Sequence, residues 1–136
     1  MITKTGLFTS TIAEAGAFLK TRDDLEAPNI QFHYAPALIV DHGRSLLWGT
    51  GMSCHSCLLR PKSLGEVTLA SADPFADPLI DPKFLSHPDD VKDMVDGYKI
   101  MMKVLGSEPF SKYISDHSQR PIDINDDADI EQAMRE

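Results

Sequence analysis

The stretch that decides the fold runs Ser53-Cys-His-Ser-Cys-Leu-Leu-Arg-Pro-Lys-Ser-Leu-Gly-Glu-Val-Thr-Leu-Ala-Ser71. Two runs with the composition of strands meet in it at a Pro-Lys-Ser-Leu-Gly break, and an apolar alternation resumes in Val67 and Leu69. Because proline and glycine interrupt strands and favour turns, this pattern predicts two strands joined by a tight turn. We expect the rest of the chain to pack around this strand pair.

Two further strands are predicted before this pair. Residues 29–38 alternate, so that one face carries Ile30, Phe32 and Tyr34 and the other carries Gln31, His33 and Ala35. Residues 13–21 are rich in small side chains, and if extended they place Glu14, Gly16 and Phe18 on one face. A helix is the alternative for this second segment, because alanine, glutamate and leucine favour helices.

The clearest helix covers residues 88–105. Pro88 is a favoured first helical residue, and Asp89 and Asp90 complement the positive end of the helix dipole. Apolar residues then recur at spacings of three and four as far as Leu105, and Gly106 provides a stop. Shorter helical patterns occupy 108–114 and 128–136.

These elements predict an α+β fold. We expect an antiparallel or mixed sheet from residues 13–20, 29–38, 52–60 and 65–71, with helix 88–105 packed on one face. The chain has 136 residues, of which 42% are hydrophobic, and this suits a single domain over 1–136.

Composition excludes several classes of function. The formal net charge of −8 argues against binding to nucleic acid or to an anionic membrane. The sequence has no apolar run of about 18 residues and no apolar signal-peptide region near its beginning, so we expect a soluble, cytoplasmic chain.

No metal site is predicted. Cys54 and Cys57 have a Cys-x-x-Cys spacing, but a zinc site needs a second pair of ligands, and in a strand two residues three apart face opposite sides. We therefore expect two packed, unpaired thiols in a reducing compartment. The repeated Asp-Pro pairs lack the central glycine and closing glutamate of a calcium loop, so we interpret them as turns; they are Asp73-Pro74, Asp77-Pro78 and Asp81-Pro82.

Several short pieces, in their order and spacing, carry a family resemblance. They are the sequences at 14–18, 28–33, 41–44, 53–55, 59–65 and 80–82. Together they resemble the substrate domain of the glucose-methanol-choline (GMC) flavin oxidoreductases, in the branch of choline and other alcohol dehydrogenases. One departure is Leu64, where that family commonly has arginine before the glycine.

The resemblance implies a section of a longer FAD-dependent enzyme that oxidises a CH-OH group of choline or another primary alcohol by hydride transfer to the flavin. In that family an N-terminal domain holds FAD through a glycine-rich loop, which this chain lacks. The catalytic histidine comes from a segment near the family's C-terminus, which would lie beyond Glu136. We therefore expect no catalytic and no cofactor-binding residue here, and neither bound FAD nor activity in the chain alone.

Glu14 and Phe18 are the candidate substrate-binding residues. Glu14 falls near the place where choline-oxidising relatives have a carboxylate, and a carboxylate beside an aromatic ring is a receptor for trimethylammonium. The alternative is a glutamate at the wet edge of the sheet. We interpret His33 and His55 as structural histidines, because nothing in sequence supplies a partner for catalysis.

A second hypothesis is a stand-alone, non-catalytic binding or assembly module derived from the same domain. For either hypothesis we expect self-association of the chain, because an apolar face or an unpaired strand edge left in water tends to bind another copy.

Overall fold

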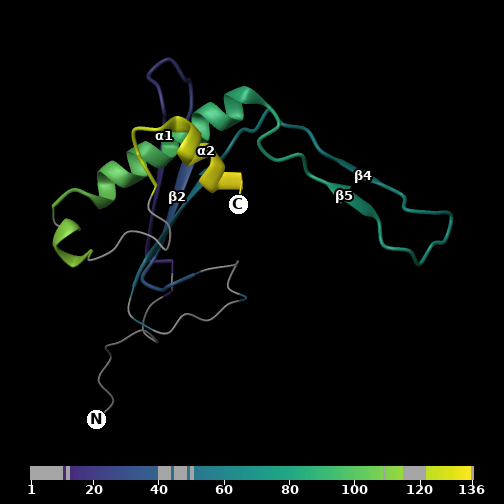
Figure 1. Ribbon diagram of the computed structural model, residues 1–136, viewed down its shortest axis with the longest axis horizontal. Helices are drawn as coiled ribbons and strands as arrows, with labels where there is room; N and C mark the ends of the chain where they lie inside the picture. Colours follow the sequence, from purple (N-terminus) through teal and green to yellow (C-terminus); the bar gives the residue numbers. More distant parts are fainter. Residues whose placement is uncertain are drawn as a thin grey trace, which may run out of the picture.

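The computed structural model describes residues 11, 13–39, 44, 49, 51–108, 110–114 and 122–135, and Figure 1 shows their arrangement. The elements are β1 (Ala15–Leu19), β2 (Ile30–Ala35), β3 (Ser53–Leu58), β4 (Glu66–Thr68), β5 (Leu79–Asp81), α1 (Pro88–Leu105), the 3-10 helix η3 (Ser111–Tyr113) and α2 (Asp127–Arg135). Strands come first and helices follow, which confirms the predicted α+β class. Most of residues 1–13 and 39–51, and part of 116–127, lie outside the described residues.

The main sheet has three antiparallel strands in the order β1-β2-β3. The register pairs Ala17 with Phe32 and Phe32 with Ser56. The central strand β2 buries Ile30 and Phe32, as its alternation predicts. Residues 15–19 form a strand rather than the alternative helix, because they pair along their whole length with β2.

The predicted pairing of the two halves of 53–71 is wrong. β3 pairs with β2, whereas β4 pairs with β5 in a separate two-stranded sheet. The backbone at Gly65 explains the change of partner, because a Cβ atom there would lie 2.4 Å from the carbonyl oxygen of Asp81. Only glycine lets the chain come this close to the end of β5, and so the sheet has three strands instead of the expected four.

Turns form at the first and the third of the Asp-Pro repeats. Residues 73–76 do form a turn, in which the Ala76 N–H donates to the Asp73 carbonyl at 3.2 Å and the Phe75 N–H to the Asp73 carboxylate at 2.9 Å. Asp81 ends β5, and its carboxylate accepts a hydrogen bond from the Lys83 N–H at 3.0 Å, which forms the turn predicted at Asp81-Pro82.

Helix α1 begins and ends at the predicted residues and crosses the main sheet (Figure 1). The core lies between them and includes Ile30, Phe32 and Met101. Gly97 permits the close approach, since a Cβ atom there would lie 3.1 Å from Ile30 Cδ1. Helix α2 packs on α1 and buries Ile130 completely. Within the described ranges, neither helix combines the length and the apolar composition needed to cross a membrane.

The N-terminus of α1 is held by a buried carboxylate. Asp90 is only 2% exposed, and it accepts hydrogen bonds from the Lys62 N–H at 2.8 Å, the Ser63 N–H at 2.7 Å and the Ser63 hydroxyl at 2.5 Å. Burial alone would raise the pKa of Asp90, but these hydrogen bonds outweigh it and hold the pKa below its usual value. The segment that leaves β3 is thereby fixed to α1.

A second set of polar contacts fixes the loop between β1 and β2. The buried Asn29 accepts from the Thr21 N–H and donates to the Thr21 hydroxyl, both at 2.9 Å. Asp93 of α1 pairs with Arg22 and accepts a hydrogen bond from the Thr21 hydroxyl at 3.4 Å. The loop is thus attached to the helix, and this holds β1 in place at the sheet edge.

Replacing Asp90 by asparagine should lower the free energy of unfolding by about 1–3 kcal/mol, because an uncharged amide cannot accept all the hydrogen bonds of the buried carboxylate. Since folding lowers the Asp90 pKa, its contribution to stability is present above the unfolded-state value of about 3.9 and is lost as pH falls through the lower folded-state value. Urea denaturation between pH 3 and 7 measures both effects. The control is Asp89→Asn, at an exposed position. Equal losses in the free energy of unfolding at the two positions would contradict the stabilising role assigned to the buried Asp90 carboxylate.

The Ser56 hydroxyl is buried and has no hydrogen-bond partner among the described residues. Ser56→Ala should therefore raise the free energy of unfolding by up to about 1 kcal/mol, because it removes the cost of an unsatisfied polar group. Ser53→Ala in the same strand should lower it by about 1 kcal/mol, since that hydroxyl donates to the Ala37 carbonyl at 2.8 Å and accepts from the Ile39 N–H at 2.9 Å. Urea titrations of both variants test the opposite signs, and a loss at Ser56 would mean that its hydroxyl is satisfied in solution.

Candidate functional site

The main sheet has one face that no described helix covers, and we call it the open face. Leu19, Ile30 and Leu58 belong to the opposite face, which packs with α1. Because side chains alternate along a strand and paired residues share a face, the open face is formed by the remaining positions. They form the rows Phe18-Gln31-Cys57 and Gly16-His33-His55, and the pair Ala35-Ser53 follows on the same side, where Ala35 is buried.

The open face is polar and aromatic but carries no lysine, arginine or carboxylate in these two rows. The side chains of Phe18, His33, His55 and Cys57 are exposed, and Gln31 is partly exposed. Phe18 has 64% of its surface accessible, which is a large value for an aromatic residue within a strand. A surface with few charges, hydrogen-bonding groups and an accessible ring is typical of a binding surface.

The two predicted substrate-binding residues lie at the β1 edge of the open face. Phe18 lies within β1, and Glu14 is exposed one residue before the strand begins. Continuing the alternation of β1 places Glu14 on the open face with Phe18, as the sequence predicted. At a rise of about 3.3 Å per residue their Cα atoms are roughly 13 Å apart, so a ligand that contacts both must lie over Gly16.

His33 and His55 are directly opposite each other on neighbouring strands. Both are exposed, and their interpretation as structural histidines stays a prediction. The alternation of 29–38 already placed His33 away from Phe32. What sequence reasoning missed was His55, because its position beside His33 follows from the β2–β3 register and no local pattern encodes that register.

The expectation of two packed, unpaired thiols is confirmed for Cys54 only, because Cys57 is exposed. Both are free, and they lie on opposite faces of β3. Cys54 packs against the core, and burial raises the pKa of its thiol, whereas Cys57 is exposed on the open face. Within the residues that the structure describes, no three histidine, cysteine or carboxylate side chains are grouped to hold a metal ion.

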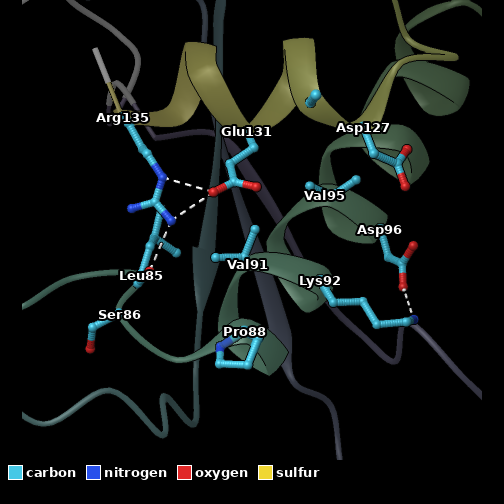
Figure 2. Close-up of a pocket in the computed structure, with 11 residues that line it drawn as sticks. Leu85, Ser86, Pro88, Val91, Lys92, Val95, Asp96, Asp127, Glu131 and Arg135 are labelled. Atoms are coloured by element: carbon cyan, nitrogen blue, oxygen red, sulfur yellow. Dashed lines mark hydrogen bonds and ion pairs between the residues drawn. The ribbon is translucent and has the colours of Figure 1, made fainter.

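A groove of about 620 Å³ lies between α1 and α2 (Figure 2). Its apolar floor includes Val91 and Val95, and charged side chains surround it. Glu131 pairs with Arg135 at 2.7 Å, and Arg135 also donates to the Leu85 carbonyl at 3.0 Å. These charges are satisfied within the protein, and none of the residues lining the groove belongs to the open face. The open face is therefore the better candidate site.

The described residues do not fit the pyrophosphate of FAD. Such a group needs helix N–H groups free of other anions. The first turn of α1 contains Asp89 and Asp90, and Asp90 is buried there; the first turn of α2 contains Asp127 and Asp129. A second anion at either helix N-terminus would be repelled by these carboxylates, so neither end provides the site.

Comparisons with known proteins agree with this architecture. The family model described as GMC oxidoreductase matches residues 61–136. The chain is 44% identical over 108 residues to an alcohol dehydrogenase [acceptor] of Pseudomonas putida, covering 79% of this chain and 20% of the relative. It is 34% identical over 136 residues to an oxygen-dependent choline dehydrogenase of Rhizobium rhizogenes, covering 100% of this chain and 25% of the relative.

Solved structures share this fold. The chain superimposes on a crystal structure of formate oxidase with a TM-score of 0.72 and 25% sequence identity, covering 80% of this chain and 20% of the formate oxidase chain. A variant of the formate oxidase of Aspergillus oryzae superimposes equally well. The chain thus spans only a fifth to a quarter of the length of these relatives. Because the family model covers more than half of the chain, this protein belongs to the GMC oxidoreductase family.

Proposed function

We propose that these 136 residues form a substrate-facing part of an FAD-dependent oxidoreductase that oxidises the CH-OH group of an alcohol, and that the open face is one wall of its substrate pocket. The observation that carries this proposal is the contrast between the two faces of one sheet. One face is buried under α1, while the other presents Gln31, His33, His55 and Phe18 without any charged side chain in its rows. An alcohol needs such hydrogen-bonding groups beside apolar surface.

In this proposal the open face binds and orients the substrate, and the flavin supplies the acceptor for the hydride. The helix N-termini of the described residues are taken by Asp89, Asp90, Asp127 and Asp129, so the pyrophosphate of FAD is held by other parts of the enzyme. The residue that removes the hydroxyl proton is also proposed to lie outside 1–136. The chain by itself is then a single, inactive domain that needs the rest of the enzyme for turnover.

The substrate is proposed to be choline or another primary alcohol. The relative named as an alcohol dehydrogenase shares 44% identity, and the one named as a choline dehydrogenase shares 34%, so both kinds of substrate have support. Glu14 and Phe18 would favour choline by placing a carboxylate and a ring on either side of Gly16, within reach of a quaternary ammonium group. A neutral alcohol would instead use Phe18 and the histidines.

We further propose a cytoplasmic location. Its support is chemical, because the described residues contain two free cysteines and one of them is exposed on the open face. Exposed thiols of this kind persist in a reducing compartment.

The alternative proposal is a non-catalytic module derived from the same domain. The DNA that flanks the coding sequence distinguishes the two proposals. In-frame coding sequence on both sides would support the enzyme if it carried a glycine-rich flavin motif upstream and a histidine-containing segment downstream. A start at Met1 and a stop after Glu136 would support the module.

The open-face proposal predicts that His33→Asn, in a full-length GMC oxidoreductase containing these residues, lowers kcat/KM for its alcohol substrate by at least about tenfold, or 1.4 kcal/mol in transition-state stabilisation. The reason is that asparagine cannot place its donor and acceptor where the imidazole nitrogens lie in the pocket wall. His87→Asn is the matched control, because His87 precedes α1 and belongs to neither row of the open face. Equal effects at both positions would reject the open face as the pocket wall.

Glu14→Gln tests the identity of the substrate in the same full-length enzyme. If choline binds over Gly16, the loss of its counter-ion should weaken binding by at least about tenfold, while a neutral alcohol of similar size should be almost indifferent. Steady-state kinetics with both substrates measure the difference. Glu26→Gln, at another exposed glutamate in the β1–β2 loop, is the control. Equal losses on both substrates would remove the argument for a cationic substrate.

A further inference from the structure

His33 and His55 lie side by side on neighbouring strands, and we call them the histidine pair. Strands β2 and β3 are antiparallel with these two residues directly opposite each other, so both side chains belong to the open face. Both residues are exposed, and a neutral imidazole has a nitrogen atom that can bind a metal ion. The histidine pair is therefore a possible chelating group that only the strand register brings together.

The separation within the histidine pair follows from the hydrogen bonds between the strands. The Leu59 N–H donates to the Asn29 carbonyl at 2.9 Å. Opposite residues in an antiparallel pair alternate between hydrogen-bonded and non-hydrogen-bonded positions, so counting from this bond makes His33 and His55 a hydrogen-bonded pair. Their Cα atoms are then about 5.5 Å apart. At this separation the two rings can turn toward one ion, whose bonds to imidazole nitrogen are about 2.0–2.1 Å long.

Packing on the other side of the sheet keeps the histidine pair in register. Ile30 pairs with Leu58, and both belong to the core beneath α1, where Ile30 is completely buried. A slip of one residue would turn these apolar side chains to the open face, which makes it unfavourable. Strand β2 is also the central strand and is held by β1 on its other side. The two histidines are thus positioned before a ligand arrives, which reduces the entropy cost of binding.

The surroundings of the histidine pair suit a cation. The two rows of the open face contain no lysine or arginine, and the chain has a net charge of −8, so its field attracts positive ions. Gly16, the neighbour of His33 on β1, has no side chain that could cover the imidazole. Because the described residues contain no group of three metal-binding side chains, water would complete the coordination of an ion held here.

We propose that the histidine pair binds one divalent transition-metal ion, of the class that imidazole ligands prefer, such as Ni²⁺, Cu²⁺ or Zn²⁺. Each histidine supplies one nitrogen to the same ion. Two ligands on one rigid sheet bind more tightly than either alone, by a factor of about 10²–10⁴ when both reach the ion. A consequence that rests on the proposed function is inhibition, because an ion on the pocket wall occupies the place of the alcohol.

Isothermal titration calorimetry of the 136-residue chain with NiCl₂ tests the site itself. We expect one strong site per chain, which His33→Asn and His55→Asn each weaken by at least about tenfold. The double variant should lose little more than either single variant, because removing one imidazole already ends chelation. Far-ultraviolet circular dichroism checks that these exposed substitutions leave the fold intact.

His87→Asn is the matched control for the titration. His87 lies before α1, outside the open face, and its Nδ1 accepts a hydrogen bond from the Asp89 N–H at 3.1 Å. Its substitution should leave the strong Ni²⁺ site unchanged. The proposal would be overturned by unchanged Ni²⁺ affinity in both variants of the histidine pair, or by an equal loss in the control. Absence of a strong site in the unsubstituted chain would overturn it as well.

Inhibition of a full-length GMC oxidoreductase containing these residues tests the consequence separately. Ni²⁺ should raise KM for the alcohol and leave kcat unchanged, a chelator should restore activity, and His55→Asn should raise the inhibition constant by at least about tenfold. If the chain binds Ni²⁺ through the histidine pair but the enzyme is not inhibited, the metal site stands and the pocket wall of the proposed function is rejected. If the chain does not bind Ni²⁺, the metal site is rejected while the pocket wall keeps its own test at His33.

Discussion

The carboxylate of Asp90 is the contact on which the arrangement of the other elements depends. It lies buried at the start of α1 and binds the backbone N–H groups of Lys62 and Ser63, which follow β3. The Ser63 hydroxyl donates to Asp90 and accepts from the His87 N–H at 3.0 Å, so it joins both sides of the same junction. One carboxylate thus joins the end of β3, the start of α1 and the segment that leads into the β4–β5 hairpin.

The sequence predicted those elements whose signals are local. Helix α1 has its expected bounds because a proline, two aspartates and an apolar period all lie within the segment itself. The partner of β4 could not be predicted in this way. It depends on Gly65 meeting the backbone near Asp81 and on a buried aspartate in a later helix, and neither contact has a counterpart in the alternation of residues 53–71. The turn residues 61–65 are an anchored connection, although their composition is that of a tight turn.

In the candidate site, too, local features could be predicted from the sequence and features that depend on distant contacts could not. Alternation was sufficient to place Gly16 and Phe18 on one side of β1, because it is a property of a single strand. Bringing His33 beside His55 requires the register between two strands, and register is set by the buried face: Ile30 must oppose Leu58 for both to contact α1. The polar rows of the open face are therefore a consequence of core packing on the other side of the sheet. The family resemblance identified the kind of domain from sequence, but the arrangement of these rows could be seen only in the structure.

The unequal environments of the two cysteines make the open face accessible to selective chemistry. Because burial raises the pKa of the Cys54 thiol, this residue has little thiolate at neutral pH, while Cys57 is exposed on the other face of the same strand. An alkylating reagent should therefore attach to Cys57 first. A fluorophore introduced there would stand two residues from His55 and beside Gln31, so its emission would report directly on whatever occupies the sheet surface. The native sequence thus already contains a single attachment point for following ligand entry.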